Sequence, residues 1–179
     1  NIYIIERELL ISQISAAFVR GYVYFERDIL APQLDKLNVR GYKFGGYIAR
    51  ISSIKSYFDE NMKLLDEENL DALFGGNHIY TKIRDDNPTR YIKGAKAKNI
   101  MAADGCIIEG EVENSVLFRG VRVGKGAKVK NCVLMQDTVI EPGVNVEYII
   151  SDKNVTITAD KEIKGTDSFP VYVAKYQVV

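Results

Sequence analysis

The chain is poor in the residues on which many enzyme and metal sites depend. Its 179 residues include one histidine, two cysteines and four prolines, and they include no tryptophan. A single histidine leaves little scope for histidine-based catalysis or metal binding. Two cysteines are too few for the disulfide framework of a small secreted protein, so we expect a protein of the reducing cytoplasm.

Excess charge and long apolar runs are also missing. The 24 basic and 24 acidic side chains cancel, whereas a nucleic-acid binder needs a basic field that displaces counterions from phosphates. No apolar run approaches the roughly 20 residues of a membrane span. We therefore expect no nucleic-acid and no membrane partner. No signal peptide is recognisable. The first residue is not Met and opens directly in a strand-like run, which suggests a piece of a longer chain.

The N-terminal half has a mixed α/β pattern. The β-branched and aromatic residues predict a strand over 1–5, and a weak alternation around glycines predicts two strands within 40–51. Ser52 or Ser53 is placed to cap a following helix. Apolar residues at helical spacing predict helices over 6–19, 54–65 and 70–74, and a short helical pattern runs from Pro32 through Leu37.

The C-terminal half repeats itself. Residues 113–118 align with 130–135 at a shift of 17, and the same shift aligns 123–129 with 140–146. Aliphatic residues recur every six positions, and a small or aliphatic residue follows each by four: Leu117, Val123 and Val129, with Val121, Ala127 and Val133. Such hexapeptide spacing is typical of a parallel β-helix, in which three short strands form one triangular coil and these side chains point inward.

We expect about four coils, because one coil alone cannot bury its apolar face. A β-sandwich of short strands is the alternative fold. Residues 169–179 alternate like a strand, and we expect them to pack beside the coils and cover an edge.

Few residues of the repeats suggest chemistry. Cys106 and Cys132 lie among aliphatic residues, so they are either a redox or metal pair or, more simply, small core residues. Five basic residues could form an anion site for a phosphorylated effector, or they could lie on a solvated outer face. These five are Arg119, Arg122, Lys125, Lys128 and Lys130. Many β-helix acyltransferases use a histidine base, but His78 precedes the repeats and reads as a linker residue.

Several stretches, in order, resemble ADP-glucose pyrophosphorylase, the glucose-1-phosphate adenylyltransferase family of glycogen synthesis. The segment 24–30 is similar to the family's D-F-x-x-D-I-I-P, and 46–47 with 54–65 is similar to its G-Y-W-x-D-V-G-T-I-x-S-Y-W-x-A-N-M-x-L-L. Shorter stretches also resemble the family's first strand, its P-I-Y-T segment and its first full coil; they are 1–5, 79–81, 113–118 and 121–124.

The resemblance implies an α/β remnant of a nucleotidyltransferase domain followed by a left-handed parallel β-helix of hexapeptide repeats. Residues 1–74 would be the C-terminal part of that α/β domain with its linker helices, 75–90 a linker, and 91–179 the β-helix with a C-terminal strand. The family's nucleotide loop and most of its sugar-phosphate contacts would lie N-terminal to this region.

One departure from the family concerns its metal site. The Asp of G-Y-W-x-D-V-G-T binds the metal in the family, whereas residues 46–53 here read G-Y-I-A-R-I-S-S and place Arg50 at that position. A guanidinium has no lone pair for Mg²⁺, and no Asp or Glu lies between Arg40 and Asp59. A local misalignment by a residue or two is the alternative explanation.

The resemblance with Arg50 implies a noncatalytic regulatory subunit of the GlgD type. Such a subunit pairs with a catalytic ADP-glucose pyrophosphorylase subunit in a homo- or hetero-oligomer, and its β-helix serves assembly and regulation. We expect no catalytic residue, cofactor or metal in this region, with Mg²⁺ bound by the catalytic partner. An active nucleotidyltransferase of the same family and a hexapeptide-repeat acyltransferase are the alternative functions.

Overall fold

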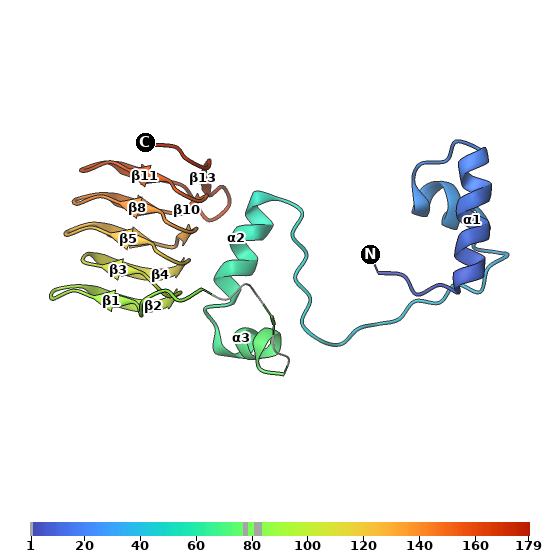
Figure 1. The fold of residues 1–179 in the computed structure, drawn as a ribbon, viewed down its shortest axis with the longest axis horizontal. Coiled ribbons are helices and arrows are strands. Elements are labelled where there is room, and N and C mark those ends of the chain that lie inside the picture. Colours follow the sequence, from blue (N-terminus) through green and yellow to red (C-terminus); the bar gives the residue numbers. More distant parts are fainter. Residues whose placement is uncertain (1, 77–78, 81–83) are drawn as a thin grey trace. The chain divides into compact units, whose positions relative to one another are not determined.

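The computed structural model describes residues 2–76, 79–80 and 84–179 (Figure 1). The chain forms two compact units, Asn1–Gly45 and Gly46–Val179. In the first unit, the α-helix α1 is followed by a turn of π-helix, η1, and a turn of 3₁₀-helix, η2. Their bounds are Arg7–Val19 for α1, Phe25–Leu30 for η1 and Ala31–Gln33 for η2.

The first unit confirms the predicted helix and corrects the predicted strands. The helix expected over 6–19 is α1. Neither residues 2–5 nor residues 40–51 form a strand in the described chain, and the first strand begins at Arg90. A strand needs a neighbour that takes up its N–H and C=O groups. No strand of the described residues pairs with these segments, so their β-type composition produces only extended chain.

The second unit begins with two helices, α2 (Ile54–Lys63) and α3 (Glu67–Phe74). The predicted cap is confirmed at Ser53, whose side chain accepts a hydrogen bond from the Ser56 N–H at 3.0 Å. In return, the Ser56 hydroxyl accepts from the Ser53 N–H at 2.8 Å, so the two serines complete a capping box. These bonds fix where α2 starts.

The rest of the second unit is a parallel β-solenoid of about four turns, and it confirms the predicted β-helix of hexapeptide repeats. The chain climbs coil by coil in Figure 1, and α2 lies beside the stack. The strands are β1 (Arg90–Tyr91), β2 (Lys96–Ala102), β3 (Ile107–Ile108), β4 (Glu111–Leu117), β5 (Arg122–Val123), β6 (Lys128–Lys130), β7 (Val133–Leu134), β8 (Val139–Ile140), β9 (Asn145–Glu147), β10 (Ile149–Ser151), β11 (Thr156–Ile157), β12 (Glu162–Lys164) and β13 (Val171–Val173).

The solenoid has three faces. The first is the sheet β1-β3-β5-β8-β11. The long strand β4 contributes to both other faces, because its first half pairs with β6 and its second half pairs with β7. The second face continues from β6 to β9 and β12, and the third continues from β7 to β10 and β13. The repeat of 17 is confirmed by the register, which places Val116 beside Val133 and Val123 beside Ile140.

The core runs along the solenoid axis and confirms most of the predicted inward positions. Of the six predicted residues, five lie in this core, each with no more than 1% of its surface exposed: Leu117, Val121, Val123, Ala127 and Val129. The sixth, Val133, is also buried, but it packs outside the coil against Phe58 of α2. Its neighbours Cys132 and Leu134 face inward instead, because alternate residues of a strand point to opposite sides.

The chain end confirms the predicted C-terminal strand. β13 pairs with β10 in parallel, and Val178 bridges to Thr156 of β11. The Thr158 hydroxyl also donates to the carbonyl of Val179 at 2.8 Å. Residues 171–179 therefore cover the open edges of β10 and β11.

Candidate functional site

Helix α2 packs on the outside of the third solenoid face. This face presents a buried apolar column of Val116, Val133 and Ile150, in adjacent coils. Phe58 of α2 is only 2% exposed and packs on Val133 and Ile150. Its ring centroid lies 6.1 Å from that of Tyr148, with the rings tilted at 49°. The apolar face of α2 thus attaches the helix to the coils.

A ladder of asparagines marks the corner between the second and third faces. Asn99, Asn114 and Asn131 follow one another in adjacent coils with φ of 49°, 48° and 51°, a left-handed conformation that asparagine tolerates well. The Asn99 Nδ2 donates to Asn114 Oδ1 at 2.8 Å, and the Asn114 Nδ2 donates to Asn131 Oδ1 at 2.6 Å. Side-chain amides therefore connect the first three coils at this corner.

The ladder stops at Tyr148. This residue takes the same corner position in the next coil, 17 residues after Asn131, and it has the same left-handed backbone, with φ of 53°. A bulky residue in this conformation costs about 1–2 kcal/mol. The Tyr148 ring contacts Phe58, so aromatic packing against α2 takes the place of an amide in the ladder.

A groove of about 500 Å³ lies between α2 and this corner, and we call it the corner groove. Its volume is within the range of about 300–1,000 Å³ that is typical of ligand sites. Asn114, Asn131 and Tyr148 line it on the side of the coils. The α2 side combines the apolar Phe58 and Met62 with charged side chains, and Asp167 follows β12 of the last coil.

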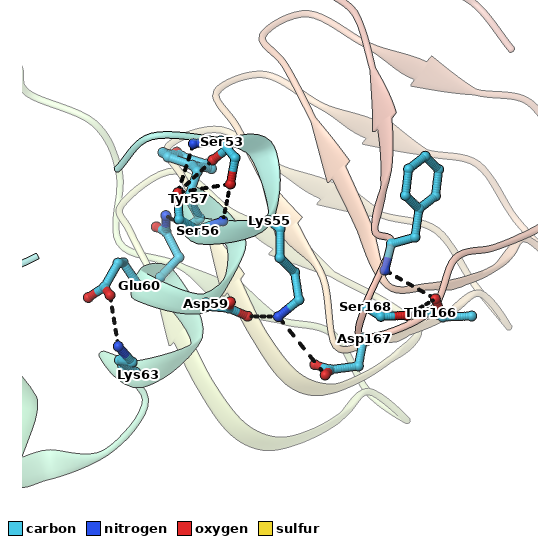
Figure 2. Close-up of polar contacts among 12 residues, drawn as sticks. Ser53, Lys55, Ser56, Tyr57, Asp59, Glu60, Lys63, Thr166, Asp167 and Ser168 are labelled. Carbon is cyan, nitrogen blue, oxygen red and sulfur yellow. Dashed lines mark hydrogen bonds and ion pairs between the residues drawn. The ribbon is translucent and has the colours of Figure 1, made fainter. Parts of the chain in front are cut away.

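Two lysines of α2 are paired with carboxylates in the corner groove (Figure 2). The Lys55 ammonium contacts Asp59 and lies 4.0 Å from Asp167. The hydrogen bond that Lys55 donates to the Asp59 carboxylate raises the pKa of Lys55. Lys63 bonds Glu60 at 2.7 Å, which raises the pKa of Lys63 and lowers that of Glu60. Both lysines therefore remain charged and paired with carboxylates of α2.

The five basic residues of the predicted effector site lie on different parts of one coil. Arg122 is on the first solenoid face, in β5, whereas Lys128 and Lys130 are on the second face, in β6. Arg119 and Lys125 occupy the turns before and after β5. The structure therefore distributes these residues along the coil and does not gather them around one point.

Lys128 and Lys130 belong to an alternating charge ladder on the second face. One row of this ladder crosses five successive strands of this face and consists of Lys98, Glu113, Lys130, Glu147 and Lys164. Lys98 bonds Glu113 at 3.1 Å across the first two coils. Opposite charges side by side stabilise neighbouring strands.

The remaining predicted residues carry no visible site. Arg50 is exposed and precedes α2 in a stretch without helix or strand. Cys106 and Cys132 are free, buried core residues, and burial raises the pKa of the Cys132 thiol to about 12. His78 lies outside the described residues. Within the part of the chain that the structure describes, no group of three or more His, Cys, Asp or Glu side chains could hold a metal ion.

The corner groove was not predicted from the sequence, although one signal for it was present. Asn114 aligns with Asn131 in the repeat of 17, whereas Asn99 precedes Asn114 by only 15 residues and falls out of that alignment. The pairing of Lys55 with Asp59 is a common i, i+4 arrangement on any helix. Only the docking of α2 brings these residues opposite the ladder.

The residues of the coils match a known family of sequences. Residues 83–169 match the family described as GlmU-like, C-terminal hexapeptide. The sequence of the coils is therefore similar to this hexapeptide-repeat family. The GlmU-like match covers nearly all of the solenoid and ends before β13.

Individual relatives extend the similarity beyond the GlmU-like coils. The chain is 38% identical over 135 residues to the glycogen biosynthesis protein GlgD of Bacillus subtilis, a match over 75% of this chain and 39% of the relative. GlgD of Geobacillus stearothermophilus is 53% identical over 70 residues, which are 38% of this chain and 20% of that protein.

A catalytic relative is also similar. The glucose-1-phosphate adenylyltransferase of Clostridium perfringens is 42% identical over 101 residues, covering 56% of this chain and 26% of that enzyme. The chain thus spans 39% or less of the length of each of these relatives. The matches confirm the resemblance to GlgD and to glucose-1-phosphate adenylyltransferases. In the described ranges, no helix is long and apolar enough to span a bilayer.

Proposed function

We propose that this chain is the C-terminal part of a noncatalytic regulatory subunit of the glucose-1-phosphate adenylyltransferase type, working in glycogen biosynthesis. The observation that carries the proposal is the 38% identity to GlgD over 135 residues. That relative is named for glycogen biosynthesis rather than for adenylyl transfer.

Arg50 supports the noncatalytic part of the proposal. Adenylyl transfer needs Mg²⁺ to neutralise the phosphates and hold them in line. The family motif G-Y-W-x-D-V-G-T, which residues 46–53 resemble, has an Asp where this chain has Arg50. A cation at this position would repel the metal ion. Mg²⁺ would then be bound by the catalytic partner subunit.

The architecture of the whole subunit follows from the same resemblance. Residues 1–74 would be the end of the nucleotidyltransferase-like domain with its linker helices, 75–90 its linker, and 91–179 a solenoid of left-handed winding. The solenoid would act as an assembly platform in a homo- or hetero-oligomer with the catalytic subunit. Its in-register parallel strands and continuous core make it suitably rigid.

Co-expression with the catalytic subunit tests the proposal. The full-length chain, the catalytic subunit and their mixture are each assayed for ADP-glucose formation from ATP and glucose 1-phosphate. We expect no turnover by the full-length chain alone, co-purification of the two chains, and a changed rate or substrate affinity in the mixture. Turnover by the chain alone at a rate like that of the catalytic subunit would refute the noncatalytic assignment.

An active adenylyltransferase is the second candidate, favoured by the 42% identity to the Clostridium perfringens enzyme. The same assay separates the two, because an active chain needs no partner for turnover. Replacing Arg50 by Asp in the full-length chain provides a further comparison. An increase in Mg²⁺-dependent turnover would show that only the residue at position 50 prevents metal binding.

A further inference from the structure

Among the described residues, the side-chain amide nitrogen of Asn131 makes one long hydrogen bond. The residue is 7% exposed, and its Oδ1 already accepts a hydrogen bond from Asn114. A carboxamide nitrogen carries two N–H groups. The one contact of Asn131 Nδ2 is with Glu147 Oε1 at 3.5 Å, at the limit of a hydrogen bond. This bond uses one N–H of the amide, and the second N–H is available to water or a ligand in the groove that Asn131 lines.

The missing acceptor has a structural cause. In the two coils below, each ladder amide donates to the asparagine of the next coil. The next corner position after Asn131 is Tyr148, whose ring turns to Phe58 and offers no amide oxygen. Asn131 and Tyr148 both line the corner groove. The Asn131 amide therefore lies where the groove meets the coils.

The charges of the corner groove exclude strongly charged ligands. Its lining carries two positive groups, Lys55 and Lys63, and three negative groups, Asp59, Glu60 and Asp167. An anion would meet a net negative lining with both lysines already paired, and a cation would compete with those lysines for the carboxylates. A neutral ligand avoids both penalties.

We propose that the corner groove binds a neutral saccharide, with a sugar hydroxyl accepting a hydrogen bond from the second N–H of the Asn131 amide. A hydroxyl group both donates and accepts, so other hydroxyls of the sugar can donate to Asp59 or Asp167. The Tyr148 ring offers an apolar surface for the C–H face of a sugar ring. The cavity of about 500 Å³ is large enough for a small oligosaccharide.

Titration of the ¹⁵N-labelled chain tests the site by the side-chain amide resonances of asparagine. The probes are maltotriose, cellobiose and sodium phosphate. Maltotriose is chosen because the proposed function is in glycogen biosynthesis, and cellobiose tests the site without that assumption. We expect at least one sugar to shift the Asn131 side-chain amide with a dissociation constant of about 1 mM or lower, and phosphate to leave this resonance unchanged.

Two variants with a matched control make the test specific. Asn131→Asp removes the donor and keeps the acceptor, and should weaken sugar binding about three- to tenfold. Tyr148→Asn supplies the missing ladder acceptor and removes the aromatic wall, and should abolish binding in a folded chain. Asn154→Asp makes the same charge change at another left-handed corner, with φ of 57°, and should bind normally.

The opposite results would overturn the site. They are the absence of any shift up to about 20 mM of either sugar, undiminished binding by both Asn131→Asp and Tyr148→Asn, or tighter binding of phosphate than of sugar at these amides. None of these results bears on ADP-glucose formation, so failure of the saccharide site and failure of the regulatory-subunit proposal are distinguishable.

Discussion

Replacing Phe58 by Ala should detach helix α2 while the coils remain folded. Phe58 is 2% exposed and packs on the outer column of the solenoid at Val133 and Ile150. Helix α2 has only 10 residues, fewer than the roughly 12–15 at which an isolated helix becomes even marginally stable. Its helical state therefore depends on docking, and Phe58 is the most buried residue of α2 at the contact.

The size of the effect follows from burial. Truncating a buried Phe to Ala costs about 3–5 kcal/mol, including the cavity that it leaves. A loss of about 4 kcal/mol changes the docking equilibrium by nearly a factor of 10³, at about 1.4 kcal/mol for each factor of ten. The core along the solenoid axis does not include Phe58. The free energy of docking should therefore fall much more than that of unfolding the coils.

Hydrogen–deuterium exchange measures the two separately. We expect amide protection in α2 to fall by about a hundredfold or more, with little change in β6 and β9 of the coils. Phe74→Ala is the matched control, because Phe74 is 46% exposed and should cost less than about 1 kcal/mol. Equal loss of protection in α2 and in the coils, or unchanged protection in α2, would refute this reasoning.

Two further predictions concern the solenoid core. Burial raises the pKa of the Cys132 thiol to about 12, above the roughly 8.5 of an unfolded cysteine. The stability that the neutral thiol contributes is complete below about pH 8.5 and is lost as the pH rises toward 12. The difference in the free energy of unfolding between the wild type and Cys132→Ala, measured with urea, should therefore shrink as the pH rises. A difference that stays constant with pH would contradict this. Gly124→Ala would place a Cβ 2.7 Å from the Pro142 nitrogen and 2.9 Å from the Glu141 carbonyl carbon, costing about 3 kcal/mol. Gly126→Ala meets no atom within 4 Å and has only its φ of 73° against it, so its melting temperature should fall less; an equal or larger fall would show that crowding at Gly124 is relieved.

The solenoid was predictable because every coil repeats the same local rule. Inward aliphatic residues such as Val123 and Ile140 recur at a fixed interval, and their register in the structure is the one that the repeat predicts. The prediction of strands near the N-terminus was wrong because those strands would not depend on a local repeat. Residues 2–5 have strand-like composition, but a strand depends on a neighbour elsewhere in the chain, and local composition carries no information about that neighbour.

The candidate site was harder to predict because it depends on docking between elements. Val133 lies in a two-residue strand, too short for alternation to show which side faces the core. Only the position of Phe58 reveals that the outside of this face is covered. The open amide of Asn131 likewise becomes apparent only when Tyr148 is seen to occupy the next corner.

Because charges alternate along the ladder on the second face, the effect of deleting coils depends on whether their number is odd or even. Its row reads Lys98, Glu113, Lys130, Glu147 and Lys164 from the first coil to the last. Deleting the coil that carries Lys130 would set Glu113 against Glu147, whereas deleting two coils would set Glu113 against Lys164 and restore alternation. The charge row therefore disfavours the loss of one inner coil, by the repulsion of two neighbouring carboxylates, but not the loss of two.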